Sequence, residues 1–333
     1  MNPSKINKNI VLIADRVSSF KGIDLSSDHL ELIEDDYFND IHEGLSSICQ
    51  SVIYYDSPAD FLKKIANHKN DIVFSIWSGR KSRNRRALVP SICEAYGILY
   101  VGADTYTNII CQDKLLSKQL SLKNGIKTPK YLFYEGGKFD ELLTKNLNLP
   151  LVVKPNFEGG SIGISKDCLV ESYETTLSKA SELFSIFKQP ILLEEFIKGK
   201  EVSIVIMGNQ EKILFCEVVE LFILNNAYDL ENKIFSFEVK KENANMILSH
   251  KLITPDFPLD ILNCAIALFK NLGKVEELRI DGRYDGKNFY LIELSPDIHF
   301  GKSGTFANAF ELKKINYTEM LSMILLNTEN YPN

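Results

Sequence analysis

The stretch Leu151-Val152-Val153-Lys154-Pro155, followed by Glu158-Gly159-Gly160-Ser161-Ile162-Gly163, carries the first indication of the fold of this chain. A lysine lies near the end of an apolar, strand-like run, and a glycine-rich turn comes soon after it. Glycine tolerates backbone angles that let successive N–H groups surround phosphate oxygens, and a nearby cation suits the same ligand. Taken alone, the stretch also fits a β-hairpin with a solvated lysine at its edge.

A second apolar run, Ile191-Leu192-Leu193, ends in Glu194-Glu195-Phe196-Ile197, and Glu201 follows shortly after. An adenine ring needs an acceptor for its amine and apolar walls for its faces, and a carboxylate holds a ribose diol well. This combination indicates a nucleoside site. The alternative is a surface turn with solvated acids.

A third motif consists of Arg279-Ile280-Asp281 on one predicted strand and Glu293-Leu294-Ser295 at the end of another. Strand alternation places Arg279 and Asp281 on one face, and likewise Glu293 and Ser295. Two carboxylates and a hydroxyl supply oxygen ligands for Mg²⁺, which completes its shell with phosphate oxygens. A salt bridge from Arg279 to either acid is the competing interpretation.

The rest of the chain predicts three units, an α/β unit followed by α+β units. Residues 1–103 alternate apolar runs with amphipathic stretches, which is typical of a parallel sheet flanked by helices. Residues 104–190 begin with a helix from Asp104 to a stop at Asn124 and Gly125, and residues 191–333 carry most of the later strands. The predicted strands are 10–14, 51–55, 71–77, 98–101, 130–134, 149–154, 191–195, 202–207, 213–219, 278–283 and 289–294, and the other helices are 61–68, 88–96, 139–144 and 260–272.

Composition narrows the classes of function. The net charge of −6 and the pI near 5.6 argue against a general affinity for nucleic acid or anionic membrane. We find no apolar run long enough to span a bilayer and no signal peptide, so we expect a cytoplasmic protein. The six cysteines stand singly, without the paired spacing of zinc sites or disulfide frameworks, and predict reduced core thiols.

In their order along the chain, these motifs resemble the ATP-grasp superfamily and, within it, D-alanine:D-alanine ligase. Further matches are Asp113-Lys114 and the segment from Tyr228 to Lys233. The resemblance implies an ATP-grasp fold behind an N-terminal Rossmann-like (pre-ATP-grasp) domain. It also implies a ligase that uses ATP and Mg²⁺ (or Mn²⁺) to join a carboxylate to an amine through an acyl phosphate. Related ligases are often homodimers.

The resemblance also assigns roles to residues of this chain. Arg279, Lys233 and Ser161 would be catalytic, with Lys233 on a loop that closes over the terminal phosphate. The metal ligands would be Asp281, Glu293 and Ser295. The nucleotide would be bound by Lys114, Lys154, Glu158, Gly159, Gly160, Glu194, Phe196, Ile197, Glu201, Lys233 and Ile292.

The substrate side departs from the family pattern. Asp15 stands where the family's N-terminal loop offers a glutamate, and the run from Gly79 to Arg86 is unusually basic. We therefore expect small-molecule substrates other than simple D-alanine, one of them anionic. The substrate candidates are Asp15, Arg80, Arg83, His299 and Ser303. The alternatives are a D-alanine:D-alanine ligase of peptidoglycan synthesis, an inactive nucleotide-binding regulator and, for the basic run, a solvated helix start.

Overall fold

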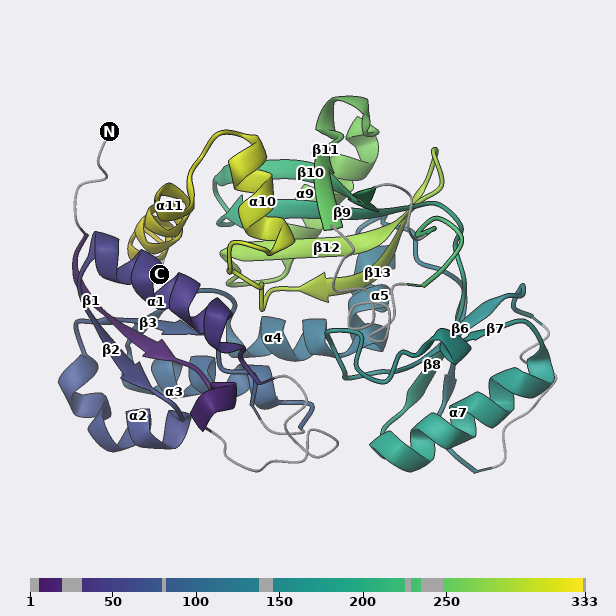
Figure 1. The fold of residues 1–333 in the computed structure, drawn as a ribbon, viewed down its shortest axis with the longest axis horizontal. Helices are drawn as coiled ribbons and strands as arrows, with labels where there is room; N and C mark the ends of the chain where they lie inside the picture. The colour runs from purple at the N-terminus through teal and green to yellow at the C-terminus, as the bar shows by residue number, and fades with distance from the viewer. Residues whose placement is uncertain are drawn as a thin grey trace.

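The computed structural model describes residues 6–19, 32–79, 82–137, 146–224, 229–234 and 248–331. The described residues form three sheets (Figure 1). The N-terminal sheet and the central sheet lie on opposite sides of the molecule, and the larger C-terminal sheet lies between them. No helix in these described ranges is both long and apolar enough to cross a membrane.

The N-terminal sheet is parallel, as the alternating sequence pattern predicts. Its strands run in the order β2-β1-β3-β4, and neighbouring residues of β1 enter different cores, because both faces of the sheet are covered by helices. The strands are β1 (Ile6–Ile13), β2 (Cys49–Tyr55), β3 (Ile72–Ser75) and β4 (Leu99–Tyr100). The helices are α1 (Asp35–Ile48), α2 (Pro58–Lys64) and α3 (Leu88–Tyr96), with short 3₁₀ turns η1 (Val17–Ser19), η2 (Ile65–His68) and η3 (Arg85–Ala87); α1 was not predicted.

The central sheet is antiparallel, in the order β5-β8-β6-β7, and α7 (Tyr173–Phe187) packs against it. The strands are β5 (Tyr131–Tyr134), β6 (Leu151–Pro155), β7 (Leu169–Val170) and β8 (Ile191–Glu195), and η4 (Lys166–Cys168) precedes β7. The predicted boundary between residues 190 and 191 would separate β8 from both of its partners. The central unit therefore extends through Glu195, because hydrogen bonding between strands joins segments that are distant in sequence.

The large sheet has the order β11-β10-β9-β12-β13. Its strands are β9 (Lys200–Gly208), β10 (Ile213–Ile223), β11 (Leu248–Leu252), β12 (Glu277–Tyr284) and β13 (Phe289–Ser295), with η6 (Thr254–Asp256) after β11. One face packs on α9 (Leu259–Asn271). The other face shares a core with the N-terminal sheet, α10 (Thr305–Leu312) and α11 (Tyr317–Glu329).

The predicted helix from Asp104 to Asn124 is wrong as a single element. It is two helices, α4 (Thr105–Gln112) and α5 (Lys114–Lys123), and α5 packs on β13 of the large sheet. Asp113 has extended backbone angles, and its side chain accepts hydrogen bonds from the N–H groups of Leu115 and Leu116, so it caps a new helix. The break makes Lys114 the first residue of α5.

Two further predictions concern the helix 139–144 and the state of the cysteines. The predicted helix 139–144 lies outside the described residues. All six cysteines are free thiols, and four of them are buried, as expected for core residues; these are Cys49, Cys93, Cys111 and Cys168.

Candidate active site

A cavity of about 640 Å³ opens between the central sheet and the large sheet. Its wall draws on β6 and the glycine-rich loop, on β8, β9, β12 and β13, and on the segment before α10. Fifteen of the residues predicted from the sequence line it, namely Lys114, Lys154, Glu158, Gly160, Ser161, Glu194, Phe196, Ile197, Glu201, Arg279, Asp281, Ile292, Glu293, His299 and Ser303. Nine of the eleven predicted nucleotide residues therefore meet in one place, and the exceptions are Gly159 and Lys233.

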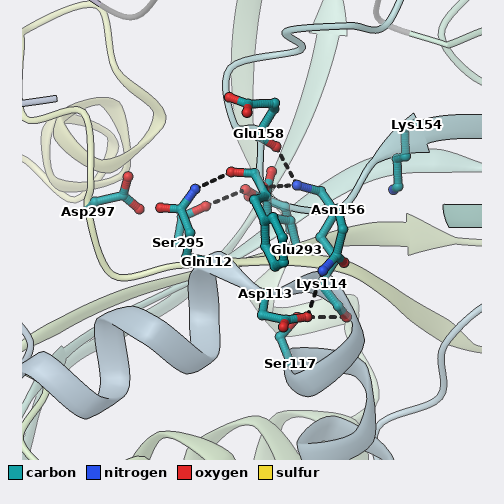
Figure 2. Close-up of polar contacts among 12 residues, drawn as sticks. Gln112, Asp113, Lys114, Ser117, Lys154, Asn156, Glu158, Glu293, Ser295 and Asp297 are labelled. Carbon is teal, nitrogen blue, oxygen red and sulfur yellow. Dashed lines mark hydrogen bonds and ion pairs between the residues drawn. The ribbon is translucent and has the colours of Figure 1, made fainter. Parts of the chain in front are cut away.

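Lys114 joins the glycine-rich loop to the large sheet. Its side chain is buried, its Nζ lies 3.0 Å from Oε1 of Glu293, and it donates a hydrogen bond to the backbone oxygen of Glu158. Figure 2 shows Lys114 in this polar cluster, with Lys154 standing apart from it. Because the capped start of α5 fixes its backbone, Lys114 presents its charge to the cavity from a rigid element.

Two lysines, Lys154 and Lys118, flank Glu194, a residue that is only 2% exposed. Strand pairing places Lys154 and Glu194 on the same face of the central sheet, and Nζ of Lys154 contacts Oε1 of Glu194. On the other side, Nζ of Lys118 lies 2.8 Å from Oε2 of Glu194. Sequence analysis missed Lys118, although it lies one helical turn after Lys114, a spacing that places both on one face of α5.

The pKa values of this triad follow from its burial. Burial lowers the pKa of Lys118 to about 8, against the opposing effect of the Glu194 carboxylate. Burial acts to raise the pKa of Glu194, but the charges of Lys118 and Lys154 lower it overall. Two ammonium groups and one carboxylate leave a net positive charge beside the cavity, which favours an anionic ligand such as a triphosphate.

The predicted metal ligands lie side by side on β12 and β13. Asp281 pairs across the strands with Glu293, and Arg279 pairs with Ser295. Asp281 accepts hydrogen bonds from Nε of Arg279 at 2.8 and 2.9 Å and from Oγ of Ser203 at 2.6 Å. The predicted alternative, an ion pair between Arg279 and Asp281, is thus present within the cavity wall itself.

These residues fit a magnesium ion that also contacts phosphate. Among the residues that the structure describes, no three His, Cys, Asp or Glu side chains gather as a metal site. Mg²⁺ commonly takes only one or two carboxylates and fills its other positions with water and phosphate oxygens. Asp281 and Glu293 supply that number, and Ser295, whose Oγ is 3.4 Å from Oδ2 of Asp281, adds a hydroxyl.

The glycine-rich loop contains two successive residues with left-handed backbone angles, which suit a turn that exposes backbone N–H groups. Gly160 and Ser161 both have positive φ, at 60° and 67°. Positive φ is uncommon for a residue with a side chain, so Ser161 is held in place by its surroundings. Gly159 lies in the wall of a second cavity, and Gly160 lies in the walls of both.

The second cavity, of about 350 Å³, lies between the N-terminal domain and the large sheet. Arg279, Glu293 and His299 belong to the walls of both cavities, so the two spaces meet at these residues. The His299 ring stacks on Tyr37 with centroids 3.9 Å apart, and burial lowers the pKa of His299. A neutral histidine is thus held next to the point where the cavities join.

The basic run reaches the second cavity with residues other than the predicted ones. Arg85 and Arg86 line it, and each forms an ion pair, Arg85 with Glu158 at 3.3 Å and Arg86 with Asp297 at 3.1 Å. Arg83 is exposed and lines neither cavity, while Arg80 lies outside the described residues. Of the described arginines in this run, Arg85 and Arg86 therefore face the second cavity, and both are paired with acids.

Asp15, Lys233 and Ser295 were also predicted as site residues, but they do not line the first cavity. Asp15 is buried, and its carboxylate accepts hydrogen bonds from the N–H groups of Ser78 and Gly79, both at 2.8 Å, next to the second cavity. Lys233 has an exposed side chain and is not part of either wall, whereas Ile234 beside it lines the first cavity. Ser295 lines the second cavity.

A family model described as "D-ala D-ala ligase C-terminus" matches residues 122–326, which is more than half of the chain. The chain belongs to the D-alanine–D-alanine ligase family. The match covers the glycine-rich loop, β8, β12 and β13, and so most of the residues that line the first cavity. The resemblance predicted from the sequence is confirmed.

Two named D-alanine–D-alanine ligases match this chain at low sequence identity. The D-alanine–D-alanine ligase of Bordetella pertussis is 29% identical over 196 residues, which are 59% of this chain and 60% of that enzyme. The aligned region thus spans less than two thirds of that relative's length. The corresponding enzyme of Pelagibacter ubique is 27% identical over 278 residues, which are 82% of this chain and 86% of the relative.

Solved structures confirm the predicted ATP-grasp fold. The D-alanine–D-alanine ligase of Bacillus anthracis in complex with ATP matches with a TM-score of 0.72 at 21% identity, covering 98% of each chain. The VanG D-Ala:D-Ser ligase of Enterococcus faecalis matches with a TM-score of 0.66 at 21% identity, covering 97% of this chain and 100% of that one. At this identity the likeness establishes the fold.

Proposed function

We propose that this protein is an ATP-dependent ligase of the D-alanine–D-alanine ligase type, which activates a carboxylate as an acyl phosphate and joins it to an amine. The observation that carries the proposal is the first cavity, where Lys114, Lys154 and Arg279 meet the paired acids Asp281 and Glu293. Family membership and the fold shared with an ATP-bound ligase support it.

The nucleotide would lie with its base against β8 and its phosphates toward β13. Glu194 accepts from the adenine amine, with Phe196, Ile197 and Ile292 as apolar walls, and Glu201 binds the ribose. Lys114, Lys154 and the glycine-rich loop bind the phosphates. A magnesium ion held by Asp281, Glu293 and Ser295 would offset negative charge on the phosphoryl oxygens.

The reaction would then proceed in two steps. A carboxylate oxygen of the first substrate attacks the terminal phosphorus of ATP, and ADP leaves. The amine nitrogen of the second substrate attacks the resulting acyl carbon, and phosphate leaves after the amine has lost a proton. Arg279 lies where the cavities join, so its guanidinium stabilises the oxyanion formed in the second step.

The first candidate for the substrate pair is D-alanine with D-alanine. The two relatives aligned by sequence are D-alanine–D-alanine ligases, so these comparisons do not support the sequence-based expectation of a different acid. The expected anionic substrate has little support either, because Arg85 and Arg86 are already paired with Glu158 and Asp297.

The second candidate, a different small amino acid pair, is favoured by Asp15. Both carboxylate oxygens of Asp15 bind backbone N–H groups, so this side chain is already engaged where the family pattern calls for a glutamate that receives an ammonium group. Burial raises the pKa of Asp15, which further weakens it as a partner for an ammonium group.

Phosphate release in the presence of ATP, Mg²⁺ and amino acids tests the proposal. Turnover with D-alanine alone would establish the first candidate, and turnover only with other amino acids would establish the second. A protein that binds ATP in calorimetry but releases no phosphate with any amino acid or dipeptide would refute the ligase proposal and favour the regulatory alternative.

A further inference from the structure

Arg283 is a charged residue of the first cavity that the reaction described above does not use. It lies on β12, two residues beyond Asp281, and pairs across the strands with Glu201. The residue is only 4% exposed, and its Nη2 lies 2.9 Å from Oε1 of Glu201. A buried arginine beside a nucleotide site needs an explanation, because burying its charge is costly unless the partners are good.

The partners of Arg283 connect two regions that are distant in sequence. Its Nη1 donates to the backbone oxygens of Gly199 at 2.9 Å and of Leu230 at 2.5 Å, and its Nη2 donates to that of Lys233 at 2.7 Å. The guanidinium also lies over the Phe196 ring, 4.9 Å from its centroid. One planar group thus contacts the proposed adenine wall, the proposed ribose ligand and the 229–234 segment.

Other contacts also attach the 229–234 segment to the rest of the structure. The side chains of Leu230 and Ile234 are buried, and the N–H of Gly199 donates to the backbone oxygen of Glu231 at 3.1 Å. Arg283 adds fixed hydrogen bonds at both ends of the run from Leu230 to Lys233. Five donors in a rigid fork suit this task better than a single ammonium group would.

We propose that Arg283 is a positioning residue that holds the 229–234 segment against the nucleotide cavity and thereby places Lys233 for catalysis. The inference rests on the proposed function, because Lys233 acts only in a protein that turns over ATP. Arg283 also contacts Glu201 and Phe196. A nucleotide bound to these two residues would therefore restrict the motion of Arg283 and of the segment that it holds.

Trypsin provides a direct test, because it cleaves the peptide bond after Lys233. The carbonyl oxygen of that bond accepts a hydrogen bond from Arg283. Arg283→Met keeps much of the apolar stem but removes every donor. We expect cleavage after Lys233, followed by mass spectrometry, to become about tenfold faster, while cleavage after Lys179 in α7 stays unchanged. Equal acceleration at both sites would indicate general unfolding and overturn the proposal.

Arg16→Met is the matched control. Arg16 is also an arginine that pairs with an acid, Asp35 at 2.6 Å, and lies over a phenylalanine ring, Phe38 at 4.3 Å, but it lines neither cavity. Its loss should leave cleavage after Lys233 unchanged. Arg283→Lys should keep an ion pair with Glu201 and most of the ATP affinity, yet leave cleavage after Lys233 severalfold faster than in the native protein.

A double-mutant cycle on turnover shows whether Arg283 acts through Lys233. Arg283→Met alone should lower kcat about tenfold, but should change it less than twofold when Lys233 is already methionine. Multiplicative losses would overturn the inference. If the native protein has no turnover, the proposed function fails, and the trypsin result then decides only whether Arg283 holds the 229–234 segment. If turnover is normal and Arg283→Met is cut no faster, the inference alone fails.

Discussion

The two cavities that meet at Arg279 and Glu293 are built differently. The first is lined largely by strand residues, where register fixes the direction of each side chain, as for Asp281 opposite Glu293. The second is lined largely by turns and loops that come together from distant parts of the chain, as for Arg86 in a 3₁₀ turn against Asp297. A strand site constrains chemistry by its register, whereas a loop site leaves more room for substrate change.

The largest expected effect comes from Arg279, which belongs to both cavities. Arg279→Met should lower the rate of phosphate release about a hundredfold to a thousandfold, because the oxyanion loses its donor. Phosphate release and the melting temperature should be measured together, with Arg16→Met as the control. A loss below tenfold in a folded protein would show that the shared wall is not catalytic.

Lys118→Met tests the charge of the first cavity. The change removes the surplus positive charge around Glu194, so we expect the Kd for ATP to rise about tenfold while unfolding becomes about 2 kcal/mol easier. Calorimetry and chemical denaturation measure the two effects. Lys179→Met is the control, because Lys179 is also buried and paired with acids, but its partners are Asp167 and Glu182 rather than Glu194.

Arg86 and Arg83 test the second cavity as a pair. Arg86→Gln breaks the ion pair with Asp297 in the cavity wall, and we expect the KM for the amino acid to rise about fivefold, equivalent to about 1 kcal/mol. Arg83→Gln changes an exposed arginine and should alter KM less than twofold. Equal effects of the two changes in steady-state kinetics would mean that the whole basic run acts as a diffuse charge.

The smallest expected effect is a pH dependence of ATP binding. Lys118, with its pKa lowered to about 8, is mostly protonated at pH 7 and mostly neutral at pH 9, so the triad loses a positive charge as the pH rises. We expect the Kd for ATP to rise about threefold between these values in calorimetry. In Lys118→Met the same interval should be flat; a persisting slope would assign the titration to another group.

The strand motifs were predictable because alternation is local. Arg279 with Asp281, Glu293 with Ser295, and the end of β8 all follow from a period of two residues, and each lies where the pattern placed it. The break at Asp113 was also visible in principle, since aspartate is a favoured helix cap, but the apolar spacing of Leu116 and Leu120 made a continuous helix the simpler interpretation.

Other features depended on contacts between distant segments. The basic run does not show which arginines turn inward, and the structure selects Arg85 and Arg86 because Glu158 and Asp297 meet them there. Asp15 looked like a substrate ligand, but its oxygens are taken by the N–H groups of Ser78 and Gly79, which β3 brings alongside β1. No local pattern reports such pairings.

The sequence by itself determined the family, the parallel N-terminal sheet and fifteen of the residues that line the first cavity, because these follow from short motifs and from the period of strands. Only the tertiary structure decided that β8 belongs to the central sheet, that Lys118 completes a buried triad, and that Arg283 joins the 229–234 segment to the cavity. The physical reason is that a buried charge is stable only where its partners converge, and convergence is a property of the folded chain.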